Sequence, residues 1–213
     1  MLSLRRLKVN KDNQYDHYKD SCIKRESAQS DRNKFFVVSL VCSACLAIFV
    51  ILPDLIVQAI LSWLQIEIAT NVNTLIFILQ GLNWAILTYA LIRYTQASIY
   101  VERAYIYESQ LENGLGLTRE GDNYLKDYPV ALDFIDFFYK NIYPLAIIIG
   151  VFAKSVFEWL SPNYSVISCL IDSLLALFII ALMVLYMAFL HKIASYYKTK
   201  QNPHSLKGES SKS

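Results

Sequence analysis

Four long apolar stretches, each with few or no charges, are the feature that most constrains what this chain can fold into. They are residues 35–64, 68–92, 141–160 and 164–190. A helix needs about 20 mostly apolar residues to cross the hydrocarbon core of a bilayer. We therefore expect an all-α membrane protein with a bundle of four transmembrane helices. A protein with two spans, in which the other stretches are buried against protein, is the alternative.

The composition and the placement of the basic residues favour four spans. The chain of 213 residues is 55% hydrophobic and only 18% charged, against about 25% charged in soluble domains. Of its 20 Lys and Arg residues, 19 lie in segments 1–34, 93–140 and 191–213. Because segments rich in Lys and Arg stay in the cytoplasm, we expect both termini and segment 93–140 on the cytoplasmic side.

A cytoplasmic helical stem is expected between spans two and three. No Gly or Pro lies between Gly81 and Gly114, so the second span should continue past Arg93 as a helix for about 30 Å. Small and aromatic residues recur in this stem at intervals of three and four, a spacing that suits packing against another helix. They are Ala97, Tyr100, Ala104, Tyr107 and Leu111. The second helix could belong to the same subunit or to another one.

The rest of segment 93–140 and the two ends of the chain are interpreted from their polarity. Residues 130–139 interleave apolar and acidic side chains, which favours an amphipathic helix on the inner membrane surface. Segment 1–34 should be loosely ordered or held on the membrane by anionic headgroups, and a docking arm for nucleic acid or protein is the alternative. Segment 191–213 is expected to be a cytoplasmic tail, disordered from Tyr197 onward.

Polar side chains within the spans are candidate functional groups, because burying them in lipid is costly. They are Asp54, Gln80, Asn83, Lys154, Glu158 and Asp172. Lys154 and Glu158 can pair on one helix face, or Lys154 can meet Asp172 or Asp54 on another span. Such charges could reach the outer interface or close ion pairs, or they could form a polar gate. The two amides could hold helices together or line a water-filled path.

Four residues of the predicted stem and the loop after it are candidates for contact with a cytoplasmic partner. They are Tyr100, Arg103, Tyr107 and Arg119. In span one, Ser39, Ser43 and Ala47 recur at four-residue intervals, and small residues on one face allow helix backbones to approach closely in lipid. This face favours tight packing, within the subunit or by self-association.

The motifs of common enzymes are absent from the sequence. It contains no G-x-x-x-x-G-K-[ST] phosphate loop, no G-x-S-x-G nucleophile turn and no H-E-x-x-H metal pair. The three histidines are far apart in the sequence, and Cys42-x-x-Cys45 lies within a span, where cysteine packs as a small apolar residue. We therefore expect no enzymatic activity, no cofactor or metal site and no small-molecule substrate.

The segment from the second span to the third resembles a known family. Its motifs are Arg93-Tyr94, Val101-Glu102-Arg103, Tyr105-x-Tyr107, Thr118-Arg119-Glu120-Gly121, Tyr124-Leu125 and Tyr128-Pro129. Over residues 93–145 the chain resembles the small multi-spanning membrane effectors of bacterial antiphage systems, especially those encoded beside retron reverse transcriptases.

The resemblance implies a protein of the bacterial inner membrane. In that family a reverse transcriptase with its RNA–DNA hybrid holds the membrane protein inactive, and phage infection releases it to damage the membrane of the infected cell. The resemblance implies no catalytic residues. Two alternatives are a small channel or transport-complex subunit, and a membrane anchor for a cytoplasmic partner.

Overall fold

A computed structural model describes most of the chain, but not all of it. The described residues are 2–52, 55, 58–59, 62–63, 72–117, 134, 137–161 and 164–201, without the side chains of 2–11, 72–74 and 194–201. Two predicted functional residues, Asp54 and Arg119, lie outside the described residues, as does most of the predicted amphipathic segment 130–139.

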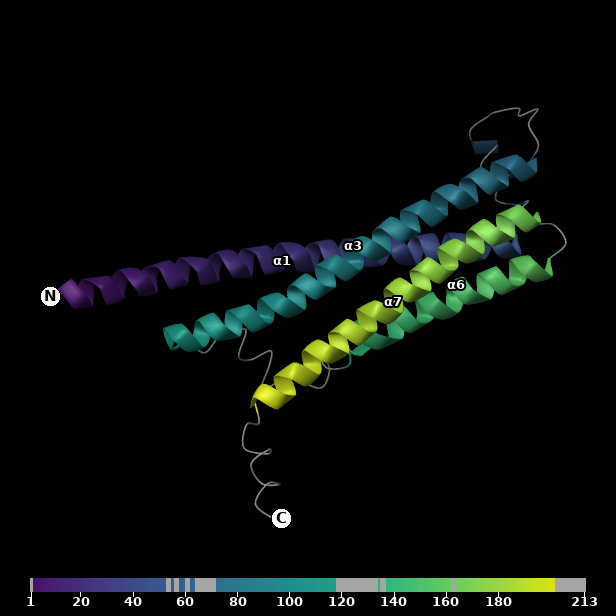
Figure 1. Cartoon of the computed structure of the whole chain (residues 1–213). Helices are drawn as coiled ribbons and strands as arrows, with labels where there is room; N and C mark the ends of the chain where they lie inside the picture. The colour runs from purple at the N-terminus through teal and green to yellow at the C-terminus, as the bar shows by residue number, and fades with distance from the viewer. Residues whose placement is uncertain are drawn as a thin grey trace, which may run out of the picture.

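Four long helices form the described fold (Figure 1), and the described residues contain no strand. They are α1 (Leu2–Ile51), α3 (Val72–Leu115), α6 (Tyr143–Leu160) and α7 (Val166–Gln201). Each contains a stretch that is long and apolar enough to cross a membrane. The prediction of an all-α, multi-pass membrane bundle is therefore confirmed.

The polar N-terminal segment is an uninterrupted part of the first helix, so the prediction of a loosely ordered or surface-bound arm was wrong. At 1.5 Å per residue, the 50 residues of α1 extend about 75 Å, well beyond the bilayer. The packed face of α1 explains this, because it recurs every three or four residues from Tyr18 and Arg25 in the arm to Ser39 and Leu46 in the span. We call residues 12–34 the arm and residues 93–115 the stem.

Two helix ends differ from the predicted boundaries and one agrees. α1 ends at Ile51, before the expected end at residue 64, because Pro53 follows and disfavours helical geometry in the residue before it. α7 continues to Gln201, past the point where disorder was expected. The stem ends as predicted at its glycines: Gly116 has a φ of 71°, and the Leu117 N–H donates to the Glu112 carbonyl at 3.0 Å, a Schellman cap.

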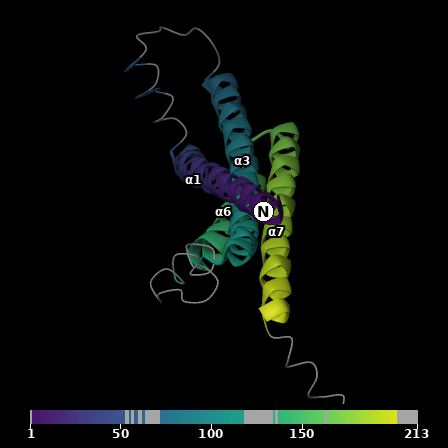
Figure 2. The ribbon, with the colours of Figure 1, turned by 90° about the vertical axis from the view of Figure 1, so that its left-hand side faces the viewer.

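The four helices form a ring in which α1 packs on α3 and α6, and α7 packs on the same two helices. α1 crosses α3 obliquely; Figure 2 shows this with the start of α1 toward the viewer. The arm and stem project together at one end, which we call the arm end, and the link between α6 and α7 lies at the other, which we call the link end (Figure 1). α1 begins and α7 ends toward the arm end.

Aromatic side chains from all four helices meet near the arm end of the spans. We call this group, Phe36, Tyr94, Tyr143 and Tyr186, the tyrosine cluster. The Tyr94 and Tyr143 rings lie 4.9 Å apart, and the Phe36 and Tyr143 rings lie 4.8 Å apart. The Tyr143 hydroxyl also forms a hydrogen bond with the Ser39 hydroxyl. The predicted small-residue face of span one is thus used in part within the subunit, although Ala47 is exposed.

A short π-helix, η1 (Phe138–Ile142), leads directly into α6. Pro144 follows in the first turn of α6, and because proline has no N–H it cannot donate to a carbonyl of the π-turn before it. The Tyr94 hydroxyl donates to the Tyr139 carbonyl in this π-turn at 3.1 Å. The start of α6 is therefore tied to α3 at the tyrosine cluster.

Two leucines on α3 test whether the bundle packs as described. Leu87 is fully buried, whereas Leu82 is 57% exposed on the outer face of the same helix. We expect Leu87→Ala to lower the free energy of unfolding by about 2–5 kcal/mol, because it leaves a cavity. Leu82→Ala should have little effect in thermal melts of the purified protein in detergent. Equal effects of the two substitutions would contradict the packing.

Candidate functional site

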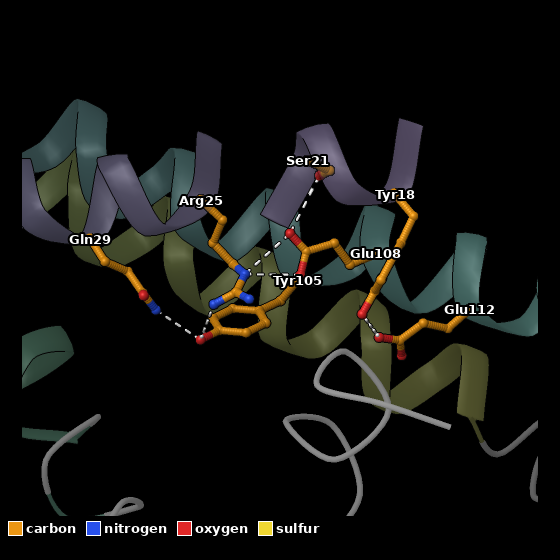
Figure 3. A network of polar contacts seen from close by, with 7 residues as sticks. All are labelled: Tyr18, Ser21, Arg25, Gln29, Tyr105, Glu108 and Glu112. Atoms are coloured by element: carbon orange, nitrogen blue, oxygen red, sulfur yellow. Dashed lines mark hydrogen bonds and ion pairs between the residues drawn. The ribbon is translucent and has the colours of Figure 1, made fainter. Parts of the chain in front are cut away.

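Polar side chains hold the arm against the stem (Figure 3). The group, which we call the polar clamp, consists of Tyr18, Ser21, Arg25 and Gln29 from α1 and Tyr105, Glu108 and Glu112 from α3. At its centre, Arg25 Nε donates to the Glu108 carboxylate, with distances of 2.9 Å to Oε2 and 3.1 Å to Oε1. The Ser21 hydroxyl donates to the same carboxylate at 3.4 Å.

Tyr105 and Glu112 extend the clamp in both directions along the helices. The Tyr105 hydroxyl accepts from Gln29 Nε2 at 2.8 Å and from Arg25 Nη1 at 3.2 Å. The Arg25 guanidinium also lies 4.6 Å from the centre of the Tyr105 ring, a cation–π contact. On the other side, the Tyr18 hydroxyl donates to Glu112 Oε1 at 2.9 Å.

The clamp is buried although it lies outside the apolar spans. Arg25 is 3% exposed, and Glu108 and Glu112 are fully buried. Breaking such a buried ion pair by removing one partner costs about 3–5 kcal/mol. Burial, with a contribution from the neighbouring Glu112 carboxylate, raises the pKa of the Tyr18 phenol, so this hydroxyl remains a donor at neutral pH. The arm is therefore held by a specific network.

The face that the stem presents to the arm is not the one that was predicted. The observed seam continues the buried face of the span, from Trp84, Leu87, Leu91 and Tyr94 to Ser98, Val101, Tyr105, Glu108 and Glu112. Of the predicted seam only Ala104 is buried, while Tyr100 and Tyr107 are exposed. The seam was missed because its outer half is polar. Its spacing of three and four residues, extended from the apolar span, is the signal that would have found it.

The predicted partner-facing residues of the stem that the structure describes lie on its open face. Tyr100 is 43% exposed and Tyr107 is 47% exposed. Arg103 lies between them on the same face, and its guanidinium is 5.0 Å from the Phe189 ring of α7. These three side chains stay accessible beside the arm, because they line a groove between the arm and the stem together with His17, Asp20 and Lys24 of the arm.

A second site lies within the bundle, near the link end. Lys154 Nζ donates to Glu158 Oε1 at 2.5 Å and to Asp172 Oδ2 at 2.8 Å. All three side chains are nearly inaccessible to solvent, and we call them the charged cluster. From the sequence, Lys154 could pair with Glu158 on the same helix or with Asp172 on another span. The structure contains both pairings.

Polar groups of α3 surround the charged cluster. Lys154 Nζ lies 4.8 Å from the Trp84 ring centre, and Gln80 is buried one turn from Trp84. Gln80 Nε2 and Glu158 Oε2 have no hydrogen-bond partner among the described residues. Asn83 instead holds helices together, because its Nδ2 donates to the Cys42 carbonyl of α1 at 3.0 Å.

The charged cluster fastens three helices at a point where unpaired charges would be costly. Lys154 and Glu158 belong to α6, Asp172 to α7, and the Trp84 ring to α3. Two carboxylates face one ammonium, so the balance of charge depends on Lys154. Intramembrane charges normally pair with one another or face a water-filled space. Here the charges pair with one another. Separation of α6 from α7 would expose them.

The comparisons with known proteins give no further guide to function. No family model matches this chain, and neither the curated proteins nor the solved structures contain a match. Within the described part of the chain, no group of three His, Cys, Asp or Glu residues is placed to hold a metal ion. The polar clamp and the charged cluster are the two buried polar networks that bear on function.

A double-mutant cycle tests the charged cluster. Lys154→Met leaves two buried carboxylates facing each other and should lower the thermal stability in detergent strongly, by about 3–5 kcal/mol. Asp172→Asn leaves a balanced Lys154–Glu158 pair and should cost less. The double variant should lose less stability than the sum of the single losses, because Asp172→Asn removes the repulsion that Lys154→Met creates. Strictly additive losses would contradict the pairing.

Proposed function

We propose that this chain is a membrane effector of bacterial antiviral defence. It resides in the inner membrane with both termini and segment 93–140 in the cytoplasm. It disrupts the membrane when a cytoplasmic partner releases it, and the infected cell then dies or stops growing. The partner that the resemblance suggests is a retron reverse transcriptase with its RNA–DNA hybrid.

The observation that carries this proposal is the continuity of the arm and stem with the first two spans. α1 contains no Gly or Pro, and α3 contains none between Gly81 and Gly114. Kinks in helices usually need such residues, so a displacement of the arm or stem is passed on to the spans. A cytoplasmic event can therefore change how the membrane helices pack.

The polar clamp suits the control of such a change. Its ion pair is buried, so removing one partner is costly, whereas separating the arm from the stem returns both charges to water and costs much less. A partner bound around Tyr100, Arg103 and Tyr107 would contact the arm and the stem together without opening the clamp, because these residues line a groove between the two helices. That arrangement supports a partner that holds the resting state and acts as a sensor.

The charged cluster supports the same proposal within the membrane. In the resting bundle its charges are paired and the core is filled by side chains such as Trp84, Leu87 and Ile179. Separation of α6 from α7 would leave Lys154 and Asp172 without each other in lipid, where charged groups draw in water. The bilayer would lose its barrier at that point, and self-association of several copies would widen the defect.

A membrane anchor for a cytoplasmic partner is the second candidate. The accessible stem face favours it, since an anchor also needs a surface that projects from the membrane. An anchor leaves the membrane intact when it is expressed alone, whereas a released effector does not. The membrane potential of expressing cells separates the two functions.

Expression with and without the genes adjacent to its own tests the proposal. Alone, the wild-type chain should collapse the membrane potential, measured with a voltage-sensitive dye, and stop growth. With the adjacent genes it should be silent, whereas Arg25→Gln should still depolarise the cells. A loss of about 1.4 kcal/mol of clamp energy shifts the resting-to-active ratio about tenfold. Lys19→Gln, an exposed change on the arm, is the matched control and should behave as wild type.

An intact potential and normal growth during expression of the wild-type chain alone, at a confirmed protein level, would contradict the effector function. Ion-selective flux in liposomes without toxicity in cells would favour a channel instead.

A further inference from the structure

A groove of about 380 Å³ lies between the arm and the stem. Its polar lining includes Lys24, Ser27 and Asp31 of α1 and Arg93 and Gln96 of α3. Phe35 and Tyr100 lie at its two ends.

One end of the groove lies at the level where the spans meet the water. Phe35 opens the charge-free stretch of span one, and Arg93 closes that of span two. The Arg93 guanidinium is 5.6 Å from the Phe35 ring centre, and that ring makes an edge-to-face contact with Tyr89 at 5.8 Å. The two boundaries are therefore at one height. Aromatic rings and basic side chains mark the headgroup region in this way.

The charges of the groove favour an anion. Among the described residues, neither Lys24 nor Arg93 has a carboxylate partner; Arg93 donates only to Gln96 Oε1, at 3.2 Å. The one acid of the lining, Asp31, pairs with Lys34 at 3.5 Å. Arg93 and Gln96 at the Phe35 end of the groove are suited to a phosphate group. Lys24 lies 11 residues before Phe35 on α1, about 16 Å along the helix, and adds positive charge near the other end.

Below the groove, the same helix faces carry exposed apolar side chains into the membrane. On α1 the face that bears Lys24, Asp31 and Phe35 continues with Val38, and on α3 the face that bears Arg93 continues with Tyr89 and Ile86. Val38 is 39% exposed, Ile86 is 42% exposed and Tyr89 is 58% exposed. A ligand with a phosphate in the groove and acyl chains along this track would contact both parts.

We propose that this groove binds an anionic phospholipid at its membrane end, with Arg93 and Gln96 on the phosphate and the acyl chains along Val38, Tyr89 and Ile86, while Lys24 adds positive charge near the other end. The lipid would bridge the arm and the stem where they leave the membrane. This site is independent of the proposed effector function, because its readout is lipid retention rather than damage to cells.

Native mass spectrometry of the full-length protein in detergent tests the site by titration with phosphatidylglycerol and phosphatidylcholine. We expect the anionic lipid to bind more tightly. Arg93→Gln should weaken it about fivefold, from about 1 kcal/mol per basic residue near the headgroups, and Lys24→Gln should weaken it less, because Lys24 lies farther from the membrane. Arg93→Lys should retain most of the affinity, and Lys19→Gln should leave it unchanged. Thermal melts of each variant establish that it is folded.

Three results would overturn the proposal. The first is equal affinity of folded Arg93→Gln and wild type for phosphatidylglycerol. The second is complete displacement of the lipid by millimolar inorganic phosphate, which would make this a site for a free anion. The third is tighter, Arg93-dependent binding of a short oligothymidylate, which would assign the groove to nucleic acid.

Discussion

One packing seam between α1 and α3 supports everything else in this structure, and its chemistry changes where the surroundings change. Within the span it is made of Cys42 and Leu46 on α1 and Leu87 and Leu91 on α3. Lipid gives no hydrophobic reason for two helices to associate, so these contacts contribute packing. In the arm and stem the same seam carries Arg25 against Glu108.

The change from apolar to ionic contacts explains how a polar arm is held in place. Its sequence has too few apolar residues to dock by burial alone. The buried Arg25–Glu108 pair and the Tyr18–Glu112 hydrogen bond specify both the partner helix and the register. Buried polar groups of this kind contribute more to specificity than to net stability. A contact that is specific but modest in net energy is also one that a partner can reverse.

The ring of helices is fastened at two levels. Near the arm end the tyrosine cluster joins all four helices through ring contacts and the Ser39–Tyr143 hydrogen bond. Near the link end the charged cluster joins α6 to α7 and reaches the Trp84 ring of α3. Because the helices between these levels contain few breaks, the two levels cannot move independently. This coupling is the physical basis of our proposal that a signal received by the arm and stem acts in the bilayer.

Much of the fold could be predicted because its determinants are local. The charge-free stretches mark the spans, and the absence of Gly and Pro up to Gly114 predicts a stem that ends where α3 does. The pairing of Lys154 with Glu158 follows from a spacing of four residues on one helix. Its simultaneous contact with Asp172 depends on how α6 and α7 are placed, so the sequence could only offer it as an alternative.

The arm and the outer half of the seam could not be predicted in the same way. Polar residues such as Arg25 and Tyr18 look like a solvated surface until the helix that covers them is known. The choice of Tyr100 and Tyr107 as seam residues followed aromatic character, whereas the structure follows the register of Leu91 and Tyr94. Long-range partners, such as Tyr143 for Ser39, leave no periodic signal in the sequence.

Hydrogen exchange of the arm in the purified, membrane-embedded protein tests the central claim most directly. If the arm is one rigid helix with the first span, backbone amides of residues 12–34 should exchange as slowly as those of the stem. Arg25→Gln should accelerate them and Lys19→Gln should not. Exchange of the wild-type arm at the rate of an unstructured peptide would contradict the account.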